Sequence, residues 1–212
     1  MVLETQRGSP GLRFILGICI IAVSIYVFYI ALAKKNAPEL FLTPVKINTQ
    51  NYPCNIVRNG TIIACIPSSM DYTKNADELL FYNVESRIRG NIRSITGLPR
   101  EDAWRDSLRN PFTKTFLGDI DSMDTYQLIK TILQFKWNPT LMGPKAKLIP
   151  TWMRSRNDAA FMLPEGSRSI IFYTNERCLG LLFTDQKILT LSIIGHMQKV
   201  QVASFMRSIT LP

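Results

Sequence analysis

The chain has 212 residues, of which 46% are hydrophobic and 19% are charged, and its formal net charge is +9 at pH 7. This length fits one ordinary domain with a membrane segment added to it. The single histidine excludes two-histidine metal sites, and the basic residues form no aromatic-interleaved tract of the kind that binds nucleic acids.

The first predicted element is a transmembrane helix over residues 14–33, after an N-terminal tail of residues 1–13. The run from Phe14 to Ala33 contains no charged residue, and a helix of this length is about 30 Å long, the thickness of a bilayer core. Ala31-Leu32-Ala33 has the A-x-A form of a signal-peptide cleavage site. The apolar run is longer than a signal peptide requires, so we predict a retained single-span anchor.

The orientation of this anchor follows from two opposing signals. Basic residues lie on both sides of the span and lean weakly toward a cytoplasmic C-terminal domain: Arg7, Arg13, Lys34, Lys35 and Lys46. The short leading tail is typical of an uncleaved signal anchor, and the cysteines that follow fit an oxidising compartment. We therefore predict an inner (cytoplasmic-type) membrane protein with its C-terminal domain outside the cytoplasm.

Residues 34–53 are predicted to form a stalk, because three prolines interrupt them and allow a short strand at most. Residues 54–212 are predicted to form a compact α+β domain. This domain begins with a β-hairpin, because Asn59-Gly60 is a strong signal for a two-residue turn. With Asn59-Gly60 at the tip, Cys54 faces Cys65 across the two strands.

Cys54 and Cys65 allow three interpretations: a disulfide, a metal clip or two free thiols. Facing residues of a hydrogen-bonded pair have Cα atoms about 5.5 Å apart, which suits a disulfide. A metal clip would lack further ligands, and in the cytosol the same residues would be two buried thiols. We predict a disulfide, with Cys19 and Cys178 free.

An amphipathic helix is predicted over residues 76–96. Its apolar residues recur at steps of four, four, four and three: Leu80, Val84, Ile88, Ile92 and Ile95. Asn75 and Glu78 resemble a capping box, and Gly97-Leu98-Pro99 is typical of a helix end.

Three arginines of this segment, Arg87, Arg89 and Arg93, lie away from the predicted apolar stripe. Such basic residues usually form a solvated face, and the alternatives are an acidic protein partner or anionic lipid headgroups. We predict that they contact a protein partner, because an arginine fork can hold a carboxylate by two hydrogen bonds.

Further elements complete the predicted domain. A short helical turn is expected within 100–110 around Trp104 and Leu108, and a second helix is expected over 122–136. Residues 139–166 contain four prolines and are predicted to be irregular, with one strand near 147–152. Four apolar runs separated by polar turns predict an antiparallel meander over 167–174, 178–184, 188–194 and 200–206, although the last run is also compatible with a helix.

Signals for chemistry are sparse. Cys178 and His196 are the one cysteine–histidine pair that could serve as the nucleophile and base of a thiol enzyme. A cysteine in an apolar strand is more often structural. Asp119, Asp121 and Asp124 resemble half of a calcium loop, but they lack its glycine and its bidentate glutamate. Helix capping explains these acids without an ion. We predict no metal site, no cofactor and no enzyme activity.

These observations predict a non-catalytic single-span membrane subunit that acts as a scaffold or assembly component of a larger membrane or envelope complex. Secretion- or pilus-type machines and membrane respiratory complexes are examples. Its partners would be other protein subunits and, through residues 14–33, the lipid bilayer, but not nucleic acid. Two alternatives stay open: a membrane-anchored ligand-binding or sensory module, with a groove between helix 76–96 and the sheet, and a thiol enzyme using Cys178 and His196.

Overall fold

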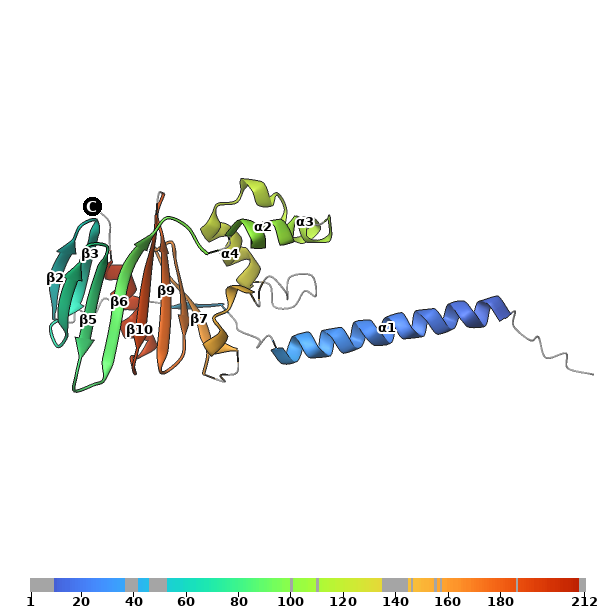
Figure 1. The fold of residues 1–212 in the computed structure, drawn as a ribbon, viewed down its shortest axis with the longest axis horizontal. Coiled ribbons are helices and arrows are strands. Elements are labelled where there is room, and N and C mark those ends of the chain that lie inside the picture. Colours follow the sequence, from blue (N-terminus) through green and yellow to red (C-terminus); the bar gives the residue numbers. More distant parts are fainter. Residues whose placement is uncertain are drawn as a thin grey trace, which may run out of the picture.

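The structure is a computed structural model. It describes residues 10–36, 42–45, 53–99, 101–109, 111–134, 145, 147–154, 156, 158–185 and 187–209. The fold is α+β, with a large sheet, a separate β-hairpin and helices on both faces of the sheet (Figure 1).

The N-terminal helix α1 spans Pro10–Asn36, so the expectation of a helix over 14–33 is confirmed. All of its large apolar side chains between Phe14 and Phe28 are 53–71% exposed. Figure 1 shows α1 lying apart from the sheet and its covering helices. Within the residues that the structure describes, no helix is both long enough and apolar enough to cross a membrane.

The main sheet has eight strands in the order β1-β7-β8-β9-β10-β6-β5-β4. β1 and β7 are parallel, and the other neighbouring strands of this sheet are antiparallel. In this order the strands are Leu42–Val45, Ala160–Pro164, Ser169–Tyr173, Arg177–Phe183, Ile188–Ile194, Ile88–Ile95, Glu78–Asn83 and Asp71–Asn75.

The separate hairpin consists of β2 (Cys54–Asn59) and β3 (Ile62–Pro67). Its turn is Gly60-Thr61, because Asn59 pairs with Ile62, and the predicted register is therefore wrong by two residues. The Asn59 side chain lies in the strand end and donates hydrogen bonds to the backbone oxygens of Asn75 (2.6 Å) and Glu78 (2.9 Å). These bonds attach the hairpin tip to the β4–β5 turn.

The predicted disulfide is confirmed, although its geometry differs from the prediction. Cys54 faces Pro67 and Cys65 faces Ile56, so the two cysteines are diagonal neighbours. Their Cα atoms are 5.5 Å apart and their sulfur atoms are bonded. Cys19 and Cys178 are free, as predicted.

The predicted helix over 76–96 is wrong, because this segment contains a hairpin turn and strands β5 and β6. Apolar residues at steps of four also fit the two-residue period of a strand. Ile88 and Ile92 do share a buried face of β6, whereas Val84 lies in the turn and is 78% exposed. Asn75 and Glu78 flank the β4–β5 turn and form no capping box.

The C-terminal meander is confirmed for β8, β9 and β10. The fourth run forms helix α6 (Lys199–Ser208), which is the alternative that the sequence allowed. Gln198 and Gln201 form a capping box at its start. Its buried residues recur with helical spacing: Val202, Ala203, Phe205 and Met206.

The opposite face of the sheet carries the helices α2 (Glu101–Leu108), α3 (Pro111–Leu117) and α4 (Thr125–Gln134). The expected helical turn in 100–110 and the expected second helix are thus confirmed, with Trp104 and Leu108 buried. The predicted strand near 147–152 is wrong, since Thr151–Met153 form a 3-10 turn. Residues 139–144 lie outside the described part of the chain.

Two hydrophobic cores therefore lie on either side of the sheet. One core joins the sheet to α6 and the β2–β3 hairpin, and it reaches β5 and β6 through Leu79, Phe81 and Ile92. The other core joins α2, α3 and α4 to β7, β8, β9 and the start of β10. The fully buried residues of this second core include none from β4, β5 or β6.

Two glycines bring the sheet and α6 close together. A Cβ atom at Gly180 would lie 2.6 Å from the sulfur of Met206, which belongs to α6. A Cβ atom at Gly90 would overlap the Phe81 ring and lie 2.6 Å from the carbonyl oxygen of Ser192. The Phe81 ring packs edge-to-face on Phe205 of α6, with centroids 5.0 Å apart. The glycines are therefore required for close packing.

The strand assignment of residues 78–95 predicts different effects for two equivalent substitutions. Ile92→Asp places a carboxylate in the core and should lower the free energy of unfolding by several kcal/mol. Val84→Asp should change it by less than about 0.5 kcal/mol, because Val84 is exposed in a turn. Thermal and denaturant unfolding of the purified variants would measure both. Equal losses would indicate that the two residues share one buried face, as in a helix.

Candidate functional site

The half of the sheet that α2, α3 and α4 leave uncovered is the candidate interaction surface. We call it the open face. It consists of side chains from β5, β6 and β10 and from the adjoining end of β9: Glu78, Leu80, Tyr82, Arg89, Asn91, Arg93, Arg177, Thr190, Ser192 and Ile194.

Cross-strand register brings these residues together. Arg89 lies between Tyr82 and Ile194, and Ile194 faces Arg177 on the next strand. Tyr82 and Ile194 are 42% and 39% exposed, so apolar surface lies beside each of these arginines. A shallow groove of about 350 Å³ runs between Leu80, Asn91, Ser192 and Ile194. The open face therefore combines an apolar floor with basic side chains.

The arginines of the open face are not neutralised from within the domain. Arg89, Arg93 and Arg177 are exposed, and none of them forms an ion pair with another described residue. Glu78 faces Arg93 across the β5–β6 pair, and its carboxylate accepts a hydrogen bond from the Asn91 side chain. These three cations therefore remain available to a binding partner.

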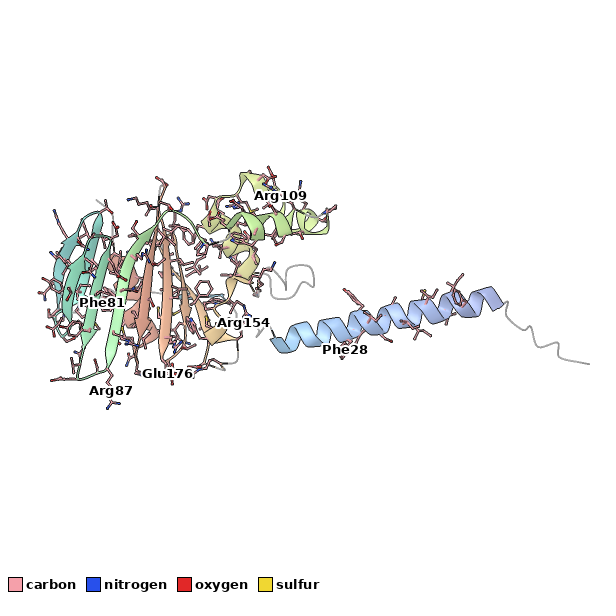
Figure 2. The ribbon with its side chains drawn as sticks, in the orientation of Figure 1. Phe28, Phe81, Arg87, Arg109, Arg154 and Glu176 are labelled. Atoms are coloured by element: carbon pink, nitrogen blue, oxygen red, sulfur yellow. A yellow bond between two sulfur atoms is a disulfide. The ribbon has the colours of Figure 1, made fainter. Side chains whose placement is uncertain are left out.

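Arg87, the third arginine singled out from the sequence, occupies the turn that precedes β6. Its φ of +54° is unusual for a residue with a side chain, and its backbone N–H donates to the Val84 oxygen at 3.3 Å. Figure 2 shows Arg87 at the end of the sheet. Arg89 and Arg93 share the open face, while Arg87 lies beyond its end. Sequence reasoning missed Tyr82, Arg177 and Ile194, which only strand pairing brings beside them.

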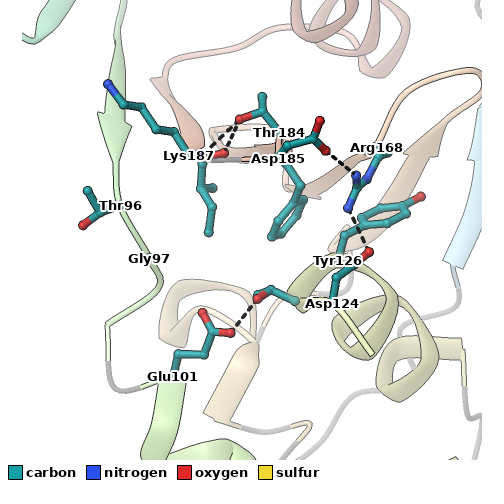
Figure 3. A pocket seen from close by; sticks show the side chains of 12 residues that line it. Thr96, Gly97, Glu101, Asp124, Tyr126, Arg168, Thr184, Asp185 and Lys187 are labelled. Atoms are coloured by element: carbon teal, nitrogen blue, oxygen red, sulfur yellow. Dashed lines mark hydrogen bonds and ion pairs between the residues drawn. The ribbon is translucent and has the colours of Figure 1, made fainter. Parts of the chain in front are cut away.

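A second hollow of about 330 Å³ lies where α2 and α4 meet the β9–β10 turn (Figure 3). Arg168 pairs with Asp124 at 2.9 Å and with Asp185 at 3.3 Å, and its guanidinium lies 5.8 Å from the centre of the Tyr126 ring. Burial raises the pKa of Tyr126, which favours its neutral phenol.

The remaining carboxylate of this hollow is also paired. Glu101 accepts hydrogen bonds from Thr125 (2.5 Å) and from Arg105 (2.9 Å), which links the start of α2 to the start of α4. The carboxylates and Arg168 are thus paired with one another or hydrogen-bonded to neighbouring residues. These polar interactions connect the helices to the sheet.

Cys178 and His196, the two residues that a thiol enzyme would use, have different environments. Cys178 is 4% exposed in the core between the sheet and α6, and burial raises the pKa of its thiol far above the usual range. A thiol in this state is a poor nucleophile. His196 is exposed, and its Nδ1 lies 3.1 Å from the backbone oxygen of Asn175.

The aspartates that resembled a calcium loop serve as caps and ion-pair partners. Asp119 accepts from the backbone N–H of Asp121 (3.2 Å), and Asp124 accepts from the backbone N–H of Gln127 (2.8 Å) at the start of α4. Asp121 pairs with Arg109 at 2.9 Å. Among the described residues, no group of three or more histidine, cysteine or acidic side chains is arranged to hold a metal ion.

An ion pair at the other end of the sheet supports the β8–β9 turn. Arg156 donates two hydrogen bonds to Asp158, at 2.9 and 3.1 Å, and the backbone N–H of Asn175 donates a third at 2.9 Å. The Arg156 guanidinium, with help from the Asn175 N–H, holds the pKa of the Asp158 carboxyl well below its usual range. The ionised carboxylate therefore stabilises the folded state.

This depressed pKa predicts a pH-dependent effect of Asp158→Asn. The stabilisation is complete above the unfolded-state pKa of about 3.9 and is lost as the pH falls toward the folded-state pKa. The variant should therefore be less stable than wild type at pH 7, and the difference should shrink in acid. Denaturant unfolding across this pH range would measure it, with exposed Asp71→Asn as the control. A difference that is independent of pH would contradict the assignment.

Comparisons with known proteins add no function. No family model matches the chain, and no curated protein matches it. A crystal structure from Bacteroides thetaiotaomicron VPI-5482 is similar to it, with 11% sequence identity and a TM-score of 0.38 over 77% of this chain and 49% of that one. The chain thus spans about half the length of that protein. Similarity at this level supports no argument about function.

Proposed function

We propose that this chain is a non-catalytic membrane subunit, in which α1 is a single-span anchor and the α+β domain is a scaffold for a protein partner. The observation that carries the proposal is the surface of α1. Its large apolar side chains from Phe14 to Phe28 point in all directions and are 53–71% exposed. A helix that is apolar all round is stable when a protein core or lipid surrounds it.

The proposed span is longer than the part of α1 whose side chains are described. It runs from Phe14 to Ala33 and contains no charged residue, whereas the continuous described run of side chains ends at Phe28. At 1.5 Å per residue the whole segment is about 30 Å long, which matches a bilayer core. The helical conformation of α1 also satisfies the backbone hydrogen bonds that lipid cannot supply.

A scaffold role is supported by the contrast between the open face and the other polar groups. The carboxylates of the hollow beside α4 are paired, and the thiol of Cys178 is buried. Arg89, Arg93 and Arg177 are exposed instead. This arrangement suits binding more than chemistry, and a membrane anchor would hold the bound partner at high local concentration.

The anchor and the scaffold role can be tested together by purification from native membranes. A tagged wild-type chain should stay in the membrane pellet after an alkaline carbonate wash. After mild detergent extraction it should carry a second protein in a fixed ratio. Ile21→Asp with Ile25→Asp should shift the chain to the supernatant, because each charge costs roughly 3 kcal/mol at the centre of a bilayer.

The matched control is Ile21→Leu with Ile25→Leu, which should behave like wild type. Release of the wild-type chain by carbonate would contradict the anchor. A wild-type chain that is retained in the membrane but carries no second protein would contradict the scaffold role.

We also propose that the domain lies outside the cytoplasm, on an inner (cytoplasmic-type) membrane. The disulfide between Cys54 and Cys65 supports this side, because such bonds persist in oxidising compartments. A membrane-permeant alkylating reagent added to intact cells should leave both cysteines unmodified, and non-reducing peptide mapping should link them. Cys65→Ser should make Cys54 reactive. Alkylation of both cysteines in the wild-type chain would contradict this placement and indicate that the domain lies in the cytoplasm.

A further inference from the structure

We infer that the open face binds an acidic, extended segment of a protein partner, which lies along β6. This inference deepens the proposed scaffold function and rests on it. The open face is uncovered by the described helices, has an apolar groove and carries three arginines without an ion pair in the described part of the chain.

The chemistry of the partner follows from the arginine side chains. A carboxylate can accept two parallel hydrogen bonds from one guanidinium, and such charge-assisted bonds are roughly twice as strong as neutral ones. The apolar surface of Tyr82 and Ile194 flanks Arg89. It would partly shield a bound carboxylate from water and so strengthen the pairing.

The spacing of the arginines favours an extended segment over a helix. Arg89 and Arg93 are four residues apart on one face of β6, which places their Cα atoms about 13 Å apart. Acidic residues at positions i and i+4 of an extended segment have the same spacing. On a helix, positions i and i+4 are only about 6 Å apart.

The residue midway between these acids would face the groove. Asn91 lies between Arg89 and Arg93 on β6, and the groove beside it is bounded by Leu80 and Ile194. An apolar side chain at position i+2 of the segment suits this place. The pattern acid-x-apolar-x-acid therefore complements β6 along its length.

Two other occupants fit the open face less well. A second copy of the chain in a two-fold arrangement would place the same basic patch against itself, and the arginines would repel one another. A planar anionic bilayer would meet the carboxylates of Asp71 and Glu78, which lie on the same side of the sheet as Arg89 and Arg93. A narrow segment along β6 avoids Asp71, and of these two carboxylates it meets only Glu78, whose carboxylate faces Arg93 and already accepts a hydrogen bond from Asn91.

The test uses the full chain in neutral-lipid nanodiscs and a fluorescent probe peptide that contains Asp-Ser-Leu-Ser-Asp. Fluorescence polarisation should show saturable binding to the wild-type chain. Arg89→Glu with Arg93→Glu should weaken it by roughly tenfold or more, which corresponds to at least 1.4 kcal/mol. A probe with Lys-Ser-Leu-Ser-Lys should bind this variant better than it binds wild type.

The matched control is Arg58→Glu with Arg207→Glu, which reverses two exposed arginines on β2 and α6 and makes the same change in net charge. It should keep wild-type affinity, and circular dichroism melting should confirm that both variants fold. Absence of saturable binding, or equal weakening by the two variants, would overturn the inference. Preferential binding to phosphatidylglycerol vesicles that Arg89→Glu with Arg93→Glu abolishes would also overturn it, in favour of a lipid-facing surface.

Native purification separates this inference from the proposed function. If the second protein copurifies equally with wild type and with the Arg89→Glu, Arg93→Glu variant, the scaffold function stands and the open face is not its docking surface. If wild type carries no second protein, the scaffold function fails even where the probe peptide binds.

Discussion

The fold depends on the close contact between helix α6 and the large sheet. Gly180 leaves room for Met206, and Gly90 leaves room for the Phe81 ring, which in turn packs on Phe205. A side chain at Gly90 would meet the Phe81 ring and the Ser192 carbonyl oxygen, and one at Gly180 would displace the Met206 side chain, so either substitution disturbs the packing of α6 on the sheet. Because the β2–β3 hairpin packs on the same core, its place beside the sheet depends on α6 as well. One helix therefore joins the hairpin to the sheet.

The two faces of the sheet are covered unequally, and this difference creates the candidate site. α6 and the hairpin form a core that reaches β5 and β6, whereas α2, α3 and α4 pack mainly on β7, β8, β9 and the start of β10. An antiparallel sheet tolerates water on one face, so the uncovered part needs no further protection to be stable. Its alternate residues are free to carry charge, and three of them are arginines. The buried core and the candidate interaction surface thus lie on opposite sides of β6.

Sequence patterns predicted those elements whose signals were local. The apolar runs of β8, β9 and β10 are separated by polar turns, and Trp104 and Leu108 mark one face of α2. The segment 76–96 was misassigned because apolar residues at steps of four fit both a helix and a strand, and pairing with β10 decides between them. One contact of that pairing, from Thr190 to Arg93, joins residues 97 positions apart. Arg89 and Arg93 were identified because they are basic and lie away from the predicted apolar stripe. Strand register, which the sequence did not predict, brings Tyr82 and Ile194 beside Arg89 and brings Arg177 beside Ile194.

The pairing of β6 with β10 also governs how the domain assembles. This inner strand pair joins the two halves of the chain, so its contacts form only after a long loop has closed. The β2–β3 hairpin is local by comparison, and its cysteines are 11 residues apart. It can therefore form and become oxidised before the edge of β6 that faces β10 is paired, and an unpaired strand edge is prone to aggregation. A required closure of this long loop is the kinetic consequence of a sheet that is built from both ends of the domain.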